Sequence, residues 1–276
     1  MKQAIVSLVS AKKNNPHCDV ALITNIEIPE KFQALFLKHN VLTIQVPFDK
    51  FLFDVNLKWN LDPYKLCALD YLVNETKYEQ FLLLDTDTYV QSDLTNLWTE
   101  AEQKILLLHI RSGLSSIDMQ HVNETYKKLY GKSVYLTLYG GEFICGSRNM
   151  LKEFLGHCQT VYNDMIAKKI STEKGNEFLV PAAVVNCPQL IKEGGAYIDR
   201  YWTGRWYTVS TNYTRICILH LPAEKDYAIP AIYKYICKHE KLPKNKKVYK
   251  LVGLPKPKRP LYMSTFKRAI KYSRKK

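Results

Sequence analysis

The sequence lacks several patterns that would assign a chain of 276 residues to a common class. No stretch approaches 18 consecutive apolar residues, so no transmembrane helix is expected. Neither a Gly-x-Gly-x-x-Gly sequence nor a phosphate-loop pattern occurs, which excludes the glycine-rich nucleotide sites. The seven cysteines include no Cys-x-x-Cys pair. This distribution predicts free thiols in a reducing compartment, and therefore a cytoplasmic protein.

Acidic residues are absent from the last part of the chain. Lys241 to Lys276 holds 14 of the 40 Lys and Arg residues, which leaves 26 basic and 26 acidic residues in the first 240. We therefore expect a globular domain at 1–240 and a basic tail at 241–276. Four prolines favour an extended segment to about Tyr262, and from Ser264 apolar residues at helical spacing favour an amphipathic helix. Such a tail suits peripheral contact with an anionic membrane, although a solvated basic terminus explains it equally well.

Short segments rich in Val, Ile and Leu alternate with segments of helical periodicity. The expected strands are Ala4 to Val9, Val20 to Ile23, Val41 to Val46, Phe81 to Leu84 and Ile105 to Leu108. The expected helices are Pro29 to His39 and Asp62 to Asn74, the second with Asp62 as N-cap and Pro63 at its first helical position. This alternation predicts a single α/β domain with a mainly parallel sheet flanked by helices.

The segment Leu82 to Val90, LLLDTDTYV, is the most informative part of the chain. The apolar run that includes Leu84 predicts a strand buried on both faces. Asp85 and Asp87 follow it directly, where ligands collect beyond the carboxyl ends of parallel strands. At a strand-to-loop bend both carboxylates can converge on one Mg²⁺ or Mn²⁺ ion, because these hard cations prefer oxygen ligands. The pattern predicts a metal site, with a solvated turn as the alternative.

Several segments resemble the GT-A glycosyltransferases, and within them the glycogenin-like, family 8-like group. The resemblance lies in Pro63-Tyr64-Lys65-Leu66, in Tyr78 to Asp87 with the Ser-Asp-Leu-Thr-Asn-Leu-Trp that follows, in Tyr139 to Gly146, in Gly175 to Leu179, and in Cys217 to His220 with the later Lys225. It spans roughly Ala4 to Tyr227. It implies a GT-A (Rossmann-like) fold and transfer of a sugar from a UDP-sugar to a glycan, protein or lipid-linked hydroxyl. Glucose is the first expectation for the sugar, and the group also suggests transfer onto a tyrosine of the chain itself.

The resemblance assigns roles to individual residues. Asp85, Asp87 and His220 would bind the metal, and two carboxylates with one imidazole suit Mn²⁺ better than Mg²⁺. Lys65, Thr86 and Lys225 would contact the donor, the lysines as point charges beside phosphate oxygens. Glu142 and Glu177 are candidates for catalytic contacts with the sugar or the acceptor. The stretch Asp199 to Tyr207 is dense in aromatic and arginine side chains and suits either a sugar or base platform or packing against the core.

Two other functions fit part of the sequence. A haloacid-dehalogenase-type phosphatase would use Asp85 as its nucleophile, but no downstream Gly-Asp or Asp-Asp pair completes such a metal site. A non-catalytic protein could bind a membrane or nucleic acid through the tail. Because the first 240 residues have no net basic charge to follow a phosphate backbone, nucleic-acid binding is not expected.

Overall fold

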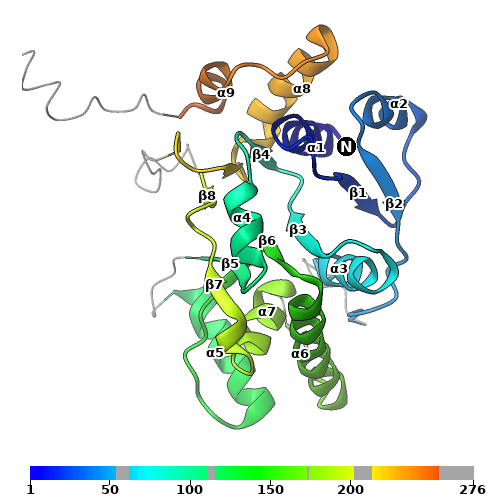
Figure 1. Ribbon diagram of the computed structural model, residues 1–276. Helices are drawn as coiled ribbons and strands as arrows, with labels where there is room; N and C mark the ends of the chain where they lie inside the picture. Colours follow the sequence, from blue (N-terminus) through cyan, green and yellow to red (C-terminus); the bar gives the residue numbers. More distant parts are fainter. Residues whose placement is uncertain (54–61, 111–115, 173, 202–212, 255–276) are drawn as a thin grey trace, which may run out of the picture.

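The computed structural model describes residues 1–53, 62–110, 116–172, 174–201 and 213–254. Helices and strands alternate along these residues (Figure 1). The helices are α1 (Lys2–Asn14), α2 (Glu30–Lys38), α3 (Tyr64–Glu75), α4 (Thr95–Ala101), α5 (Ile117–Tyr130), α6 (Arg148–Ala167), α7 (Asn176–Val184), α8 (Ala228–His239) and α9 (Asn245–Val252). The strands are β1 (Ala21–Thr24), β2 (Leu42–Gln45), β3 (Gln80–Leu84), β4 (Thr88–Val90), β5 (Ile105–His109), β6 (Tyr139–Ser147), β7 (Ile191–Glu193), β8 (Ile198–Arg200) and β9 (Ile218–His220). The predicted α/β class is confirmed.

The described strands form three sheets, one of them parallel and two of mixed direction. The orders are β1-β2, β3-β6-β5-β7 and β4-β9-β8. Strand β6 runs antiparallel to both β3 and β5, and β4 runs antiparallel to β9, whereas β1-β2, β5-β7 and β8-β9 are parallel pairs. The expectation of a mainly parallel sheet is therefore wrong for the described strands. The family resemblance implied a glycine-containing strand at Tyr139 to Gly146, and β6 confirms it.

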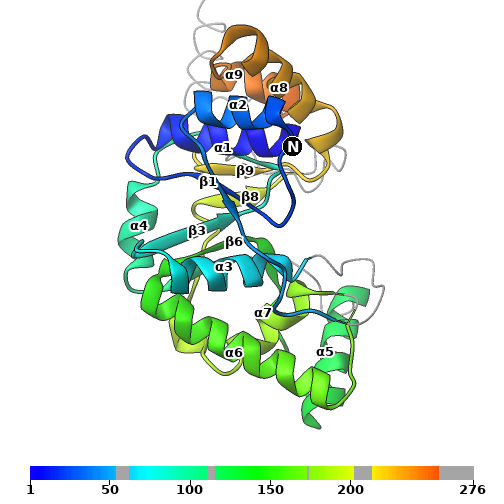
Figure 2. The same cartoon turned by 90° about the vertical axis from the view of Figure 1, so that its right-hand side faces the viewer.

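The central sheet has a core on each face because successive residues of a strand point to opposite sides. In β5, Ile105 and Leu107 pack with α3, α5, α6 and α7 in one cluster, while Leu106 and Leu108 pack with α4 in another. Figure 2 shows α3 and α6 together beside β3 and β6. Strand β3 was predicted to be buried on both faces, but Phe81 is its one buried residue. The reason is that β3 is an edge strand of its sheet.

The N-terminal segment is a helix, so the strand expected at Ala4 to Val9 is wrong. An apolar run alone does not distinguish a strand from a buried helical segment. In the structure, the polar side chains that follow this apolar run hydrogen-bond to β4 and its surroundings. Ser10 Oγ accepts from the Val90 N–H at 2.9 Å, Asn14 Nδ2 donates to the Val90 carbonyl at 3.0 Å, and Asn15 Oδ1 accepts from the Leu94 N–H at 2.8 Å. Helix α1 thus covers the free edge of β4.

Strands β1 and β2 form a sheet of their own, separate from the sheet that contains β3. A cleft of about 1130 Å³ lies between them, lined by residues of α1, β1, α3 and β3 and reaching Asp85, Thr86, Asp87 and Lys225.

The other sequence-based strands and the helix α2 agree with the structure to within two residues. Helix α3 is confirmed, but Pro63 is its N-cap residue and Asp62 makes no side-chain cap.

The basic C-terminal region is partly folded. Helix α9 packs through Val248 and Val252 against α8 and α1, so the extended conformation expected from Lys241 to Tyr262 is wrong for Asn245–Val252. The helix expected from Ser264 lies outside the described residues.

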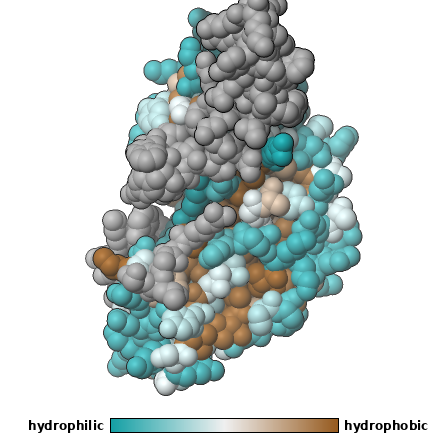
Figure 3. Space-filling view, turned by 90° about the vertical axis from the view of Figure 1, so that its left-hand side faces the viewer, coloured by the Kyte–Doolittle hydropathy of each residue, from teal (hydrophilic) through white to brown (hydrophobic). Residues whose placement is uncertain are grey.

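None of the helices in the described ranges is long and apolar enough to cross a membrane. The face in Figure 3 is mostly hydrophilic, with apolar side chains gathered in the lower half of the molecule.

Candidate metal centre

Asp85 and Asp87 lie in the short connection between β3 and β4, and the backbone around them is fixed. The Asp85 N–H donates to the Glu142 carbonyl at 3.1 Å, which continues the pairing of β3 with β6 by one residue. The Asp87 carbonyl accepts from the Leu221 N–H at 2.9 Å, and Thr88 Oγ1 donates to the Asp85 carbonyl at 2.8 Å. Both carboxylates are therefore delivered by a bend that is held from two sheets.

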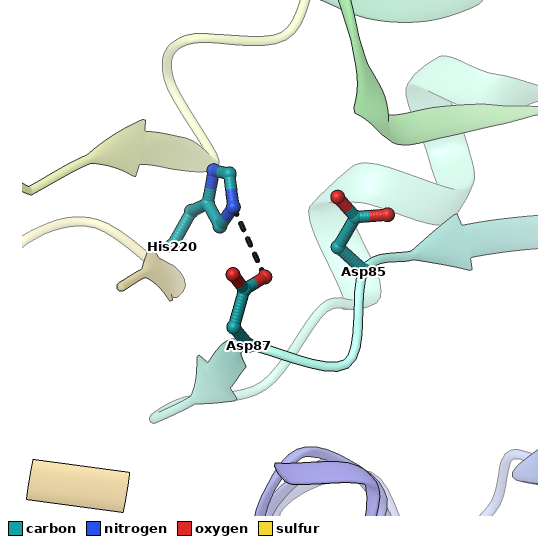
Figure 4. Close-up of side chains that lie close together, drawn as sticks. All are labelled: Asp85, Asp87 and His220. Carbon is teal, nitrogen blue, oxygen red and sulfur yellow. Dashed lines mark hydrogen bonds and ion pairs between the residues drawn. The ribbon is translucent and has the colours of Figure 1, made fainter. Parts of the chain in front are cut away.

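His220 reaches the same place from the other end of the chain. It ends β9, and the antiparallel register sets it opposite Thr88, directly after Asp87. Its Nε2 lies 3.1 Å from Asp87 Oδ1. Figure 4 shows the imidazole and the two carboxylates turned toward one another. The structure therefore brings together the three residues that the sequence reasoning selected as metal ligands.

The three side chains fit one divalent ion. One ligand atom from each lies within 4.8 Å of the others. Ligands about 2.1 Å from a common ion are roughly 3 to 4.2 Å apart, so a small contraction would suffice. Two carboxylates and one imidazole suit a divalent cation of the Mg²⁺ or Mn²⁺ kind, with the nitrogen favouring Mn²⁺.

Burial and pairing set the charges in this cluster. Burial by itself lowers the pKa of His220, but its contacts with Asp87 and Glu142 outweigh burial and raise that pKa to about 9. Burial opposes ionisation of Asp87 too, yet the imidazole beside it keeps the Asp87 pKa below its ordinary value. The pKa of Asp85 is raised by burial, against the effect of Lys65. Without metal, the protein thus holds a protonated His220 between carboxylates, and a bound cation would replace that proton.

The predicted donor-binding residues border the cluster in different ways. Lys65, on α3, has its Nζ 2.7 Å from Asp85 Oδ1 and 3.5 Å from Asp62 Oδ1. Lys225 is exposed on the 3-10 turn Glu224–Asp226 and lines the cleft. Thr86 is exposed, with Oγ1 3.5 Å from Gln3 Oε1. All three therefore lie beside the cleft, and their contact with a donor stays a prediction.

Glu142 and Glu177 differ in exposure. The Glu142 residue is 1% exposed and is bound through both carboxylate oxygens by Arg200, with Nη2 2.8 Å from Oε2 and Nε on Oε1. These contacts and His220 hold the pKa of Glu142 far below its ordinary value, although burial opposes this. Glu177 begins α7 with 36% of its side chain exposed, 3.7 Å from Arg200 Nη2. Burial raises its pKa despite the nearby Arg200 and Lys174.

Arg200 is the residue whose role the sequence did not define. It lies in the aromatic and arginine-rich stretch from Asp199, but nothing in that stretch indicated a buried glutamate as its partner. Tyr201 in the same stretch is fully buried and packs near Tyr213, with ring centroids 6.5 Å apart, so it belongs to the core. Residues 202–207 of the proposed platform lie outside the described residues.

Comparisons with known proteins support the fold. No protein-family profile matches the sequence. No curated protein matches it either. Among solved structures, the chain is similar to the apo form of mouse xyloside xylosyltransferase 1, with a TM-score of 0.52 and 10% sequence identity over 79% of this chain and 90% of that one. At this identity the likeness establishes a GT-A-like α/β fold and leaves the reaction to be argued from the site.

Proposed function

We propose that this protein is a metal-dependent glycosyltransferase that moves a sugar from a UDP-sugar to a hydroxyl acceptor. The observation that carries the proposal is the convergence of Asp85, Asp87 and His220 at the rim of a cleft of about 1130 Å³. A cleft of this size accommodates a nucleotide-sugar, since ligand sites commonly measure about 300–1,000 Å³. The GT-A-like fold supports the same reading.

Each part of the site has a task in that reaction. When bound, Mn²⁺ or Mg²⁺ would act as a Lewis acid on the diphosphate that leaves C1 of the sugar. Asp85, Asp87 and His220 would hold the ion. Lys65 and Lys225 would place positive charge beside phosphate oxygens, Lys65 after giving up part of its contact with Asp85.

The sugar would lie on the Glu177 side of the site. Glu177 is partly exposed, and its raised pKa makes its ionised carboxylate a stronger base than that of an ordinary glutamate. It can therefore accept a hydrogen bond from a sugar hydroxyl or take up a proton from the acceptor. Glucose is proposed as the first donor to test, and xylose as the second because the structurally similar mouse protein is a xylosyltransferase.

The direct test is a donor screen by thermal shift with Mn²⁺. A UDP-sugar at 100 times its Kd should stabilise the folded protein by about 2.7 kcal/mol, because it binds only the folded state. The same screen with Asp87→Asn is the control and should show no Mn²⁺-dependent shift. If no nucleotide-sugar shifts the wild-type protein in the presence of Mn²⁺, the proposal fails.

The acceptor requires its own experiment. Transfer onto a tyrosine of the chain would add mass in hexose steps when the protein is incubated with UDP-glucose. An unchanged intact mass would exclude this acceptor and leave a separate glycan, protein or lipid-linked hydroxyl.

The phosphatase alternative is tested by p-nitrophenyl phosphate turnover, and His220 beside the aspartates gives no support to it.

We further propose that the C-terminal region contacts anionic membrane surfaces. Seven lysines of α8, α9 and their connection are exposed: Lys234, Lys238, Lys241, Lys244, Lys246, Lys247 and Lys250. Together with the basic residues among 255–276, they give the C-terminal region its positive charge. Deleting residues 255–276 should weaken binding to anionic vesicles at low salt and leave transfer to a soluble acceptor intact. Equal vesicle binding with and without the tail would contradict this role for the tail.

A further inference from the structure

Glu142 contacts both halves of the candidate metal centre from the middle of β6. Its backbone carbonyl accepts the Asp85 N–H at 3.1 Å. Its carboxylate Oε1 lies 3.3 Å from His220 Nδ1, the ring nitrogen on the side away from Asp87. One residue therefore touches the bend that carries the two aspartates and also the imidazole that completes the cluster.

The Glu142 carboxylate is held by Arg200. Arg200 Nη2 is 2.8 Å from Oε2, while Nε contacts Oε1. An ionised carboxylate has about four lone-pair sites, so Oε1 can accept from Arg200 and from the imidazole at once. Because the pair is buried and bidentate, the carboxylate stays charged and has little freedom to turn toward a substrate.

A carboxylate beside Nδ1 has a defined effect on the histidine. It favours the tautomer with the proton on Nδ1, which leaves the Nε2 lone pair for a cation. In the metal-free arrangement Nδ1 is within reach of Glu142 but is not aligned with it as a hydrogen bond. The buried nitrogen thus has a charged acceptor close by and no other hydrogen-bond partner among the described residues.

We propose that Glu142, held by Arg200, is a positioning residue that fixes the His220 ring with its proton on Nδ1 and Nε2 directed to the metal. Glu142 then acts through His220 and does not touch the sugar or the acceptor. This inference rests on the proposed function, because it assumes that the cluster binds a divalent cation.

Gly140 supports this arrangement. A Cβ at position 140 would lie 1.8 Å from Glu142 Oε2 and 2.6 Å from Oε1, so a side chain there would displace the carboxylate. Only glycine leaves the carboxylate where Arg200 and His220 reach it. The local sequence Gly140-Gly141-Glu142 therefore allows the placement of this one side chain.

The test is Mn²⁺ affinity, measured by calorimetry on the full chain at one neutral pH. Glu142→Gln removes the charge beside Nδ1 and should weaken Mn²⁺ binding about 10- to 100-fold, the usual cost of losing such a partner of a metal-binding histidine. Glu177→Gln is the matched control: it alters another carboxylate near Arg200 that does not touch His220, and should leave Mn²⁺ affinity within about twofold. Excess Mn²⁺ should restore turnover in Glu142→Gln and not in Glu177→Gln.

Two further measurements complete the test. Arg200→Lys keeps the charge but loses the two-donor fork, and should weaken Mn²⁺ binding relative to the wild type. If Glu142→Gln does not fold, an unchanged Mn²⁺ affinity in Arg200→Lys overturns the inference. In the ¹H–¹⁵N spectrum of Mg²⁺-loaded protein, the wild type should show a slowly exchanging His220 Nδ1 proton that Glu142→Gln loses. If the wild type binds Mn²⁺ and Glu142→Gln binds it with the same affinity, this inference alone is overturned. If the wild type does not bind Mn²⁺, the proposed function is overturned as well.

Discussion

The protonated His220 makes the stability of the metal-free protein depend on pH. Its pKa is about 9 in the folded state against 6.5 in its ordinary state. A pKa raised on folding means that the folded protein binds the proton more tightly. The stabilisation is therefore fully present below pH 6.5 and is lost as the pH rises through about 9.

The size of the effect follows from the same two values. Each pKa unit corresponds to about 1.4 kcal/mol, so the contacts of His220 with Asp87 and Glu142 contribute about 3 kcal/mol at pH 6 and almost nothing above pH 9. His220 is 4% exposed, so solvent screens these contacts little. Loss of about 3 kcal/mol is a large part of the 5–15 kcal/mol that a folded domain commonly has.

Urea unfolding of the wild type and His220→Gln measures this contribution, with a chelator present throughout. Other groups titrate in both proteins, so the difference between their unfolding free energies isolates His220. This difference should fall by about 3 kcal/mol between pH 6 and pH 9.5. A difference that stays constant over this range would show that the imidazole is not held as a cation between carboxylates.

Three other substitutions and one control test separate parts of the site. Asp87→Asn should abolish Mn²⁺-dependent turnover of a UDP-sugar and also destabilise the metal-free protein by about 1–3 kcal/mol, because it removes the partner of a buried charge. The control Asp93→Asn changes an exposed carboxylate outside the cluster and should keep full turnover with little change in stability. Gly140→Ala should lower the melting temperature and weaken Mn²⁺ binding together, and a normal Mn²⁺ Kd in this variant would argue against the tight approach of Glu142. Glu177→Gln should lower kcat with an unchanged Mn²⁺ Kd, and an unchanged kcat would remove Glu177 from the reaction.

The two candidate aspartate ligands were predictable because their signal is local. A short apolar run that ends in Asp85 and Asp87 identifies a strand followed by a bend, and β3 ends at Leu84 as expected. His220 follows another apolar run, and its place opposite Thr88 could be expected only from the family resemblance, because strand pairing between distant segments has no local signal. The ion pair of Glu142 with Arg200 was not predictable for the same reason.

The N-terminal helix shows a different limit. Ala4 to Val9 has the composition of a buried strand, and the decision between strand and helix depends on Ser10, Asn14 and Asn15, whose side chains meet the edge of β4. Tertiary hydrogen bonds of this kind override the local preference for a strand.

The pairing of β4 with β9 also sets the order in which the metal centre is assembled during synthesis. Asp87 and His220 are 133 positions apart, and the contact between them forms only after His220 has been made. At 5–20 residues per second, β4 waits roughly 7–25 seconds for its partner strand while α1, already synthesised, covers its other edge. A nascent chain that stops before β9 would therefore carry both aspartates and still have no complete set of metal ligands.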